Sequence, residues 1–500
     1  MIIKNWYPFN ESLMLCLTCD KNKRSMMNTT TLGRAGLIVL LAGQLLPMID
    51  FSIVNVALDA MSASLRASAI ELALIVAIYG IAFAVCLAMG SRLGDNFGRR
   101  KIFITGVWLF AVASLLCGVA TDVKTLLLAR ALQGAGAALV VPQILATLHV
   151  TLHGRAHARA IGLYGGIGGL AFIIGQVMGG FLIGANVAGY GWRSVFLINL
   201  PVCLAILLTA RRFIPETRNP EPLPLDIAGT LLLAGATGSL MVALALGPVL
   251  HWTWPCLLLL ALFPLLLLQL WRTEVALEKR GGAPLLPPLL LRLPSMRFGI
   301  SLAVLFFSCW SGFMFAVALT LQSGAGMSAF SSGNAFIALG AAYFLVSISS
   351  TRIVEHLGKR ATLLLGCAIQ MSGLLLLMAT FYYGWATIGV LILMPATLVI
   401  GGGQALIVST FYRIGMADVP RDYAGAGSAT LSTVQQAVFG MGPMVLGSVF
   451  TQMLLQGDYR HAVLATLAAE WLLMLALVAH TLWSRRIFAV PCRQTTAPLE

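Results

Sequence analysis

The sequence predicts an all-α, polytopic membrane protein of fourteen spans, arranged as two six-helix bundles with two inserted helices. Three observations support this fold class: the composition, the placement of positive charge and an internal repeat. Hydrophobic residues make up 59% of the 500 residues and charged residues 10%, with a mean hydropathy of +0.90. Because a soluble domain carries about 25% charged residues, this chain has too little polar surface to stay in water.

Apolar segments long enough to cross a bilayer follow one another along the chain. The predicted spans are residues 35–57, 70–90, 102–120, 125–147, 160–184, 194–210, 227–247, 253–271, 298–322, 333–350, 361–381, 386–411, 425–455 and 462–483. The predicted organisation is a tail (1–34), a first six-helix bundle (35–210), the inserted pair with its linkers (211–297), a second bundle (298–483) and a final tail (484–500).

Lysine and arginine residues determine the predicted orientation. Of the 32, 27 fall in one alternate set of loops and the two tails, whereas the opposite loops carry four. Loops rich in these residues stay in the cytoplasm, so both tails are predicted to be cytoplasmic (N-in, C-in). The net charge of +14 then reflects membrane topology, and no nucleic-acid partner is expected.

The sequence offers little basis for catalytic, metal or cofactor chemistry. It contains no GxxxxGK[ST] phosphate loop, no HExxH pattern and no paired Cys/His cluster. Cys16 and Cys19 form a single CxxC without a second pair, and most other cysteines lie in apolar segments as small hydrophobes. We therefore expect neither an enzyme nor a bound metal or cofactor. Met26 and Met27 offer a second start site just before the first span.

A charged loop between the second and third spans, SRLGDNFGRRK at residues 91–101, recurs as TRIVEHLGKR at residues 351–360. The matched positions are Asp95 with Glu355, Gly98 with Gly358, Arg99 with Lys359 and Arg100 with Arg360. Each copy follows the second span of a six-span set, which is the pattern of transporters built from two parallel halves. Chance similarity of two basic loops is the alternative.

Charged side chains inside the spans need a reason, because each costs roughly 2.5–3.5 kcal/mol at the bilayer centre. Asp50 in span 1 is a candidate for proton uptake and release, since a low-dielectric site favours the neutral carboxyl. Arg130 in span 4 could tune a nearby acid. Each could equally be a permanently paired structural group, and Glu470 in span 14 could serve helix pairing as well as proton coupling.

Polar residues that could face a substrate path lie in spans 1 and 4. Gln44 and Asn55 share one helical stripe, and Asp50 points roughly 120° away from it, so the stripe and the acid should face different neighbours. Gln133 follows Arg130 by one turn and is the third candidate for the substrate path.

Span 5 is dense in glycine, with small-xxx-small spacing that permits close helix contact. Its GQVMGG stretch contains Gly175, Gln176, Gly179 and Gly180, and span 13 repeats the theme with Gly440. One such helix in each half would suit the interface between halves that rock against each other. Ordinary membrane packing is the alternative.

Five motifs together resemble the major facilitator superfamily, in particular its fourteen-span drug:proton antiporter branch (EmrB/QacA-type). They are the loop at 91–101, MIDFSIVNVAL in span 1, LLLARALQGAGAA in span 4, the span-5 glycines and GWRSVFLINLP at the entry to span 6. The resemblance covers residues from about 35 to 485. The chain departs from the family pattern where Gln176 replaces a proline of span 5, Ser91 a glycine of the loop and Asp59 a proline of span 1.

The resemblance implies export of small, lipophilic organic molecules against inward proton flow by alternating access. It assigns proton coupling to Asp50 and Arg130, and control of the conformational switch to Asp95. It also implies a bacterial inner-membrane location, and by family analogy alone a periplasmic adaptor protein as a partner. Alternatives are a narrow-specificity metabolite exporter or importer of the same fold, and a sensor or lipid-handling protein without transport.

Overall fold

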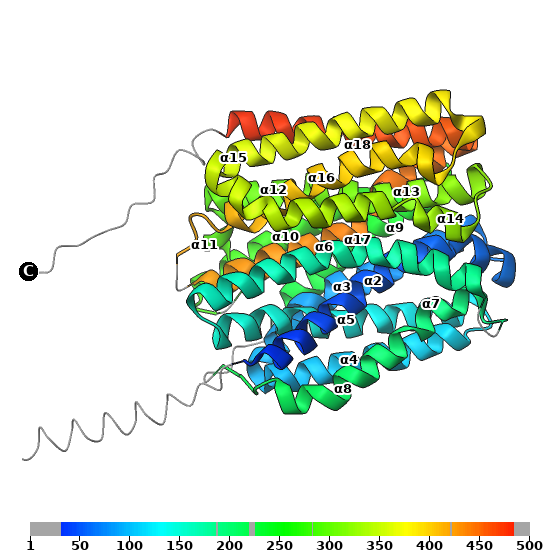
Figure 1. The fold of residues 1–500 in the computed structure, drawn as a ribbon. Helices are drawn as coiled ribbons and strands as arrows, with labels where there is room; N and C mark the ends of the chain where they lie inside the picture. Colours follow the sequence, from blue (N-terminus) through cyan, green and yellow to red (C-terminus); the bar gives the residue numbers. More distant parts are fainter. Residues whose placement is uncertain (1–31, 187–188, 220–225, 283, 421–422, 485–500) are drawn as a thin grey trace, which may run out of the picture.

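The computed structural model of the protein describes residues 32–186, 189–219, 226–282, 284–420 and 423–484 (Figure 1). Most of both predicted tails, including the Cys16–Cys19 pair, lies outside the described residues. The described part of the chain is built of helices, whose long axes run side by side (Figure 1). The start of α2 and the end of α18 lie at the same end of this array (Figure 1).

The helices fall into three consecutive groups along the chain. The first comprises α2 (Arg34–Leu65), α3 (Ala69–Phe97), α4 (Arg99–Val119), α5 (Val123–Thr151), α6 (Gly154–Ala185), the turn η2 (Gly191–Arg193), α7 (Ser194–Leu197) and α8 (Asn199–Phe213). The second comprises α9 (Ile227–Leu246), α10 (Trp254–Lys279) and α11 (Pro288–Leu291). The third comprises α12 (Pro294–Leu302), η3 (Ala303–Phe307), α13 (Ser308–Leu319), η4 (Thr320–Gly324), α14 (Ala329–Asn334), α15 (Ile337–Tyr383), η5 (Trp385–Thr387), α16 (Val390–Gly415), α17 (Ala424–Gln456) and α18 (Tyr459–Trp483).

By length and hydropathy, eleven of the described helical segments could cross a membrane, and two bent pairs raise the number to thirteen. The α14–α15 stretch, Ala329–Tyr383, counts as one segment of 55 residues although the sequence predicts two spans there. Inside α15 the helix is interrupted at Gly358, whose φ of 80° and ψ of 159° are not helical. A helix of 47 residues would extend about 70 Å at 1.5 Å per residue, more than twice the hydrocarbon thickness.

Polar side chains cap the N-termini of several helices. Ser68 and Glu71 form a reciprocal capping box at the start of α3, and Asp122 accepts a bond from the Thr125 backbone N–H at 2.9 Å at the start of α5. The hydrogen bonds from Thr125 lower the pKa of Asp122 below its usual value. These caps satisfy backbone groups that would otherwise be unpaired at the helix ends.

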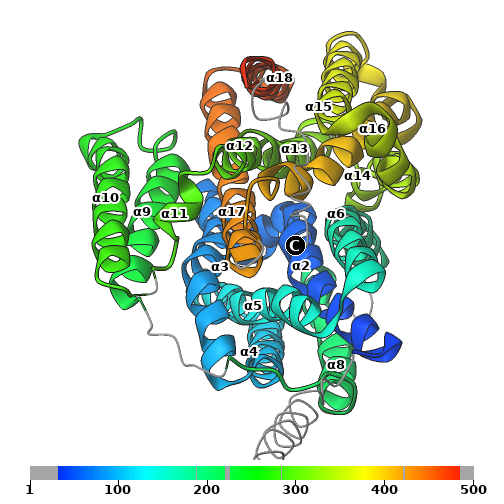
Figure 2. The same cartoon turned by 90° about the vertical axis from the view of Figure 1, so that its left-hand side faces the viewer.

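An end-on view separates the helix groups in space (Figure 2). Helices α2 to α8 form one body, α12 to α18 form most of the other, and α9 and α10 pack together at the edge beside α3 and α17 (Figure 2). Only 11% of the apolar stretch of α10 is buried in the protein, so most of its surface is available to lipid. The pair is therefore peripheral to the two bodies.

Glycines mark the closest contacts between the two bodies. A Cβ added at Gly80 in α3 would lie 2.8 Å from the Gly440 Cα in α17, and one added at Gly180 in α6 would lie 2.4 Å from the Ala329 carbonyl oxygen in α14. Only glycine permits this approach of two backbones. The glycine-rich helices α6 and α17 thus lie at the contact between the bodies, as the sequence suggested.

We predict that Gly440→Leu lowers the melting temperature of the purified protein, because the added side chain collides with the α3 backbone. Overpacking of this kind typically costs about 1–3 kcal/mol. Gly238→Leu is the matched control, since a Cβ at Gly238 in α9 meets nothing within 4 Å. Equal shifts for the two variants would show that the Gly80–Gly440 contact does not matter for stability.

Candidate functional site

A buried ion pair lies at the centre of the first helix group. Arg130 Nη1 donates to Asp50 Oδ2 at 2.5 Å, and both side chains are 0–1% exposed. The second carboxylate oxygen, Asp50 Oδ1, accepts bonds from Gln133 Nε2 at 2.6 Å and Asn199 Nδ2 at 2.9 Å. Both amide nitrogens also donate to Ser114 Oγ. The carboxylate thus joins α2 to α5 and α8, and Ser114 adds α4 to the cluster through the two amides.

The Arg130 guanidinium has further partners besides Asp50. Its Nε donates to the Ile75 carbonyl oxygen at 3.3 Å and its Nη1 to Gln133 Oε1 at 2.7 Å. Its Cζ lies 4.2 Å from the centroid of the Tyr79 ring, a cation–π contact. The Tyr79 hydroxyl donates in turn to the Pro47 carbonyl oxygen, which fixes the ring against α2.

Removing either charge from this cluster leaves the other unpaired in a low-dielectric interior. A buried pair gains little net stability, but breaking one by removing a single partner costs about 3–5 kcal/mol. Protonation of Asp50 would neutralise one partner without removing any atoms, and it would weaken the bonds of the carboxylate to α5 and α8.

The structure brings together the predicted pair Asp50 and Arg130 and adds two residues that sequence reasoning missed. Asn199 and Ser114 are buried polar residues in otherwise apolar segments. The signal that singled out Asp50, a polar side chain inside a predicted span, could have identified these two residues as well. Gln133, predicted for the substrate path, belongs to this cluster instead and lines none of the described cavities.

The prediction of a loop at 91–101 is wrong in one respect: α3 runs on to Phe97 and α4 begins at Arg99, so only Gly98 is not helical. The segment, which keeps the name charged loop, is docked on the residues that follow α8.

Asp95 and Arg99 form an ion pair, Oδ1 to Nη2, of 2.7 Å. The Arg99 backbone N–H donates to the Thr217 carbonyl oxygen at 2.8 Å, and Arg100 N–H donates to Glu216 Oε1 at 3.1 Å. Asp95 lies in the last turn of α3, and its partner Arg99 is the first residue of α4.

The second loop copy repeats the geometry of the first. Gly98 and Gly358 both have positive φ, 108° and 80°, directly before the two basic residues. Arg100 donates to the Ile214 carbonyl oxygen just after α8, and Arg360 donates to the Leu482 carbonyl oxygen near the end of α18. In each copy the second basic residue therefore caps the last helix of its group.

The two copies differ in charge pairing. Among the described ion pairs, Asp95 has one and its counterpart Glu355 has none. Glu355 and its neighbour Lys359 are exposed, with Glu355 lining the mouth of a cavity. The first copy is the more tightly bound of the two.

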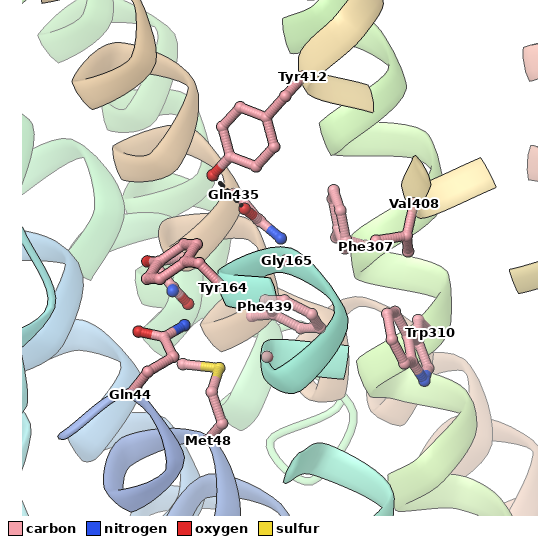
Figure 3. Close-up of a pocket in the computed structure, with 12 residues that line it drawn as sticks. Gln44, Met48, Tyr164, Gly165, Phe307, Trp310, Val408, Tyr412, Gln435 and Phe439 are labelled. Atoms are coloured by element: carbon pink, nitrogen blue, oxygen red, sulfur yellow. Dashed lines mark hydrogen bonds between the residues drawn. The ribbon is translucent and has the colours of Figure 1, made fainter. Parts of the chain in front are cut away.

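A cavity of about 800 Å³ lies between the two bodies. It opens at the end that carries the charged loops, where Arg159, Glu355 and Arg413 line it. Its inner end is a recess of about 40 Å³, shown in Figure 3, that shares Tyr164 and Tyr412 with the outer part.

The walls of the inner recess are aromatic and amide side chains. They are contributed by α2, α6, η3, α13, α16 and α17, and comprise Gln44, Met48, Tyr164, Gly165, Gly168, Phe307, Trp310, Val408, Tyr412, Gln435, Gln436 and Phe439. In Figure 3 the amide of Gln44 points toward Tyr164, and Tyr412 donates to Gln435 Oε1 at 2.9 Å. At the opposite end the bodies meet, where Ser323 Oγ donates to Asp59 Oδ1 at 3.2 Å.

Of the three predicted substrate-path residues, the structure places only Gln44 on this cavity. Asn55 is buried, and neither end of its amide has a hydrogen-bond partner. Asp50 lies on another side of α2 and lines none of the described cavities, in agreement with the helical angle expected between it and Gln44. The carboxylate and the cavity are therefore separate sites on one helix.

The glycines of GQVMGG divide between two neighbours. Gly175 and Gly179 pack on α2, where an added Cβ would lie 1.9 Å from Ser52 Oγ and 2.8 Å from Ile53 Cγ1 respectively. Gly180 packs on α14. Gln176, which stands where the family pattern has proline, is fully buried with no hydrogen-bond partner for its amide.

A second buried carboxylate lies in the third helix group. Glu470 of α18 is 0% exposed, and its Oε1 accepts a bond from Gln370 Nε2 of α15 at 3.2 Å. Its other oxygen has no partner. The contact joins two helices of one group, which agrees with the helix-pairing alternative for this residue.

The fold and these sites define a multi-pass membrane transporter with a central cavity and a separate buried charge cluster. A family model described as Major Facilitator Superfamily matches residues 40–443, and the chain belongs to this superfamily. It is accordingly a transporter and not an enzyme.

Curated bacterial relatives extend over most of the chain. A probable actinorhodin transporter of Streptomyces coelicolor is 33% identical, covering 83% of this chain and 72% of its own. The multidrug resistance protein Stp of Mycobacterium tuberculosis and the puromycin resistance protein pur8 of Streptomyces alboniger are each 30% identical, covering 84% and 83% of this chain and 76% and 81% of their own. The chain is thus a homologue of bacterial drug-resistance transporters.

Solved structures support the fold. A POT family transporter in complex with 5-aminolevulinic acid superposes with a TM-score of 0.63 at 13% identity, covering 90% of this chain and 96% of its own. The human organic anion transporter MFSD10 gives 0.59 at 16% identity, covering 89% and 99%.

We predict that Arg130→Met destabilises the folded protein by about 3–5 kcal/mol, because Asp50 is left buried without its counter-charge. The double variant Asp50→Asn with Arg130→Met should recover much of the loss. The check is a double-mutant cycle on melting temperatures in detergent. Additive single effects would contradict a coupled pair.

Proposed function

We propose that this protein is a proton-coupled exporter of small, lipophilic organic molecules that works by alternating access. The observation that carries the proposal is the combination of a buried Asp50–Arg130 cluster in one body with an uncharged aromatic recess between the bodies. Relatives named for resistance to, or export of, puromycin, tetracenomycin C and cephamycin support export as the direction.

We further propose fourteen spans with both tails in the bacterial cytoplasm. The two parts of α15 on either side of Gly358 would be separate spans, which adds one to the thirteen candidates. Residues 35–210 and 298–483 would be the two bundles, with α9 and α10 as the inserted pair. The matched loop glycines and the matched Arg100 and Arg360 caps support this division.

In this topology the cavity of the structure faces the cytoplasm. The contacts of Gly180 and Asp59 would close the outer side, and substrate would enter past the charged loops. The Asp95 loop would act as a latch that stabilises the outward-facing state. With the cavity facing the cytoplasm, the structure would be the inward-open state, and the Asp95–Arg99 pair would then belong to the released latch.

Proton coupling would act through α2. Asp50 faces the charge cluster, while Gln44 and Met48 of the same helix face the recess. Protonation at Asp50 would loosen the cluster and let α2 move, which changes the recess. One proton moving down 100 mV yields about 2.3 kcal/mol, enough for roughly a fifty-fold gradient of a neutral substrate.

We expect Asp50→Asn to abolish proton-driven efflux while the protein still inserts, because the amide does not exchange a proton. The variant leaves Arg130 without its counter-charge, so its melting temperature should fall, and efflux is compared at equal amounts of folded protein. Efflux is measured in everted vesicles with and without a protonophore. Glu470→Gln is the matched control, a buried carboxylate outside the cluster, and should retain proton-driven efflux. Normal pumping by Asp50→Asn would make Asp50 a structural residue.

We expect Asp95→Ala to lower the transport rate without removing substrate binding, since the loop lies away from the recess. Initial rates in proteoliposomes and equilibrium binding to the detergent-solubilised protein separate the two effects. Glu355→Ala, at the unpaired second copy, should have a smaller effect on rate. Lost binding with intact folding would instead place the Asp95 loop in the substrate path.

A further inference from the structure

Among the described residues, no acidic side chain that could pair with a bound cation lines the inner recess of the cavity. Over α2, α5, α6, α12–α13 and α15–α17, which surround it, the sequence contains only three acids: Asp50, Asp59 and Glu355. Asp50 is 0% exposed and paired with arginine, and Asp59 bonds Ser323 at the closed end. Only Glu355 lines the cavity, at its mouth. An organic cation in the recess would lose its hydration without gaining a counter-charge.

The mouth is positively charged. Two arginines, Arg159 and Arg413, line it together with a single acid, Glu355, so the net charge of these three side chains is positive. His149 and His157 line the same wall and bond each other, with 2.8 Å between His149 Nδ1 and His157 Nε2, so this pair adds no permanent charge. A positively charged entrance raises the local concentration of anions and lowers that of cations.

The recess presents flat apolar surfaces. The ring centroids of Phe307 and Phe439 are 5.1 Å apart, and those of Trp310 and Phe439 are 5.7 Å apart. The Tyr164 and Tyr412 side chains lie across the recess (Figure 3). Aromatic walls of this kind favour a planar aromatic ligand, which can pack face or edge against the rings.

Two buried acceptors in the recess lack partners. Gln44 and Gln436 are each 3% exposed and line the recess. The Oε1 atom of each, like the Tyr164 hydroxyl toward which the Gln44 amide points, has no partner at hydrogen-bond distance and angle. A buried acceptor left unpaired is costly, so a ligand that donates to it gains affinity. Hydroxyl or N–H groups on the edge of a planar ligand would supply these donors.

We infer that the cavity takes planar aromatic molecules that are uncharged or anionic and carry hydroxyl or N–H donors, and that it rejects organic cations. This inference rests on the proposed export function, because it treats the cavity as the transport site. It narrows the substrates from lipophilic molecules in general to one class of charge and hydrogen-bonding pattern.

Binding to the purified full-length protein tests the inference. The probes are a dihydroxyanthraquinone with hydroxyls remote from the quinone carbonyls, its dimethyl ether, which lacks donors, and ethidium, a planar cation that has N–H donors. We expect the dihydroxy compound to bind at least about tenfold more tightly than either of the others. Ethidium binding as tightly as the dihydroxy compound would overturn the charge argument, and equal binding of the ether would overturn the donor argument.

Variants assign the effect to the two amides. Gln44→Leu and Gln436→Leu should each weaken binding of the dihydroxy compound by roughly three- to tenfold and leave the ether nearly unchanged. Gln404→Leu is the matched control, a buried amide of α16 with unpartnered atoms that lines none of the described cavities. Gln436→Glu should raise ethidium affinity, since it introduces the missing counter-charge.

Transport in proteoliposomes under an imposed pH gradient separates this inference from the proposed function. Selective binding of the dihydroxy compound without proton-driven movement of any probe would overturn export and leave the ligand class standing. Proton-driven transport that prefers ethidium would leave export standing and overturn the ligand class.

Discussion

The buried ion pair between Asp50 and Arg130 is the interaction on which the first helix body depends. A membrane interior makes an isolated charge expensive, so separating these two side chains is costly. Through Gln133 and Asn199 the same carboxylate reaches α2, α5 and α8, while the guanidinium reaches the backbone of α3. A change at one oxygen atom is therefore transmitted to the relative positions of several helices.

The charge cluster and the cavity are spatially distinct. Helix α2 carries Asp50 on one side and Gln44 with Met48 on another, so it is the element that touches both sites. Direct competition between proton and substrate for one carboxylate does not fit this arrangement. Coupling in the proposed mechanism is conformational, since both ligands would bias the position of the same helix.

The two bodies meet at glycines, where their backbones approach each other closely. Gly80 meets Gly440 near the middle, and Gly180 meets Gly333 and Ala329 toward the closed end. Backbone contacts at glycine have no long side chains to disengage if the bodies separate, as the proposed mechanism requires. At the other end, ion pairs hold the first charged loop, and a bond from a basic residue to a helix-end carbonyl is made in both copies.

The sequence by itself determined the membrane class, the positions of most apolar helices and the repeated charged segment, and it singled out Asp50 and Arg130 as charges inside spans. It could do so because the cost of polar groups in a bilayer is a property of single segments and needs no knowledge of their neighbours.

Tertiary structure decided what each polar side chain touches. Gln44 and Gln133 look alike in sequence, yet one lines the recess and the other bonds Asp50, and Asn199 joins the cluster from 149 residues away. The net charge of the side chains that line the cavity could likewise not be predicted from the sequence, because it depends on which faces of separate helices meet. Helical periodicity fixes angles within one helix, whereas the rotation of each helix against its neighbours is set only by packing.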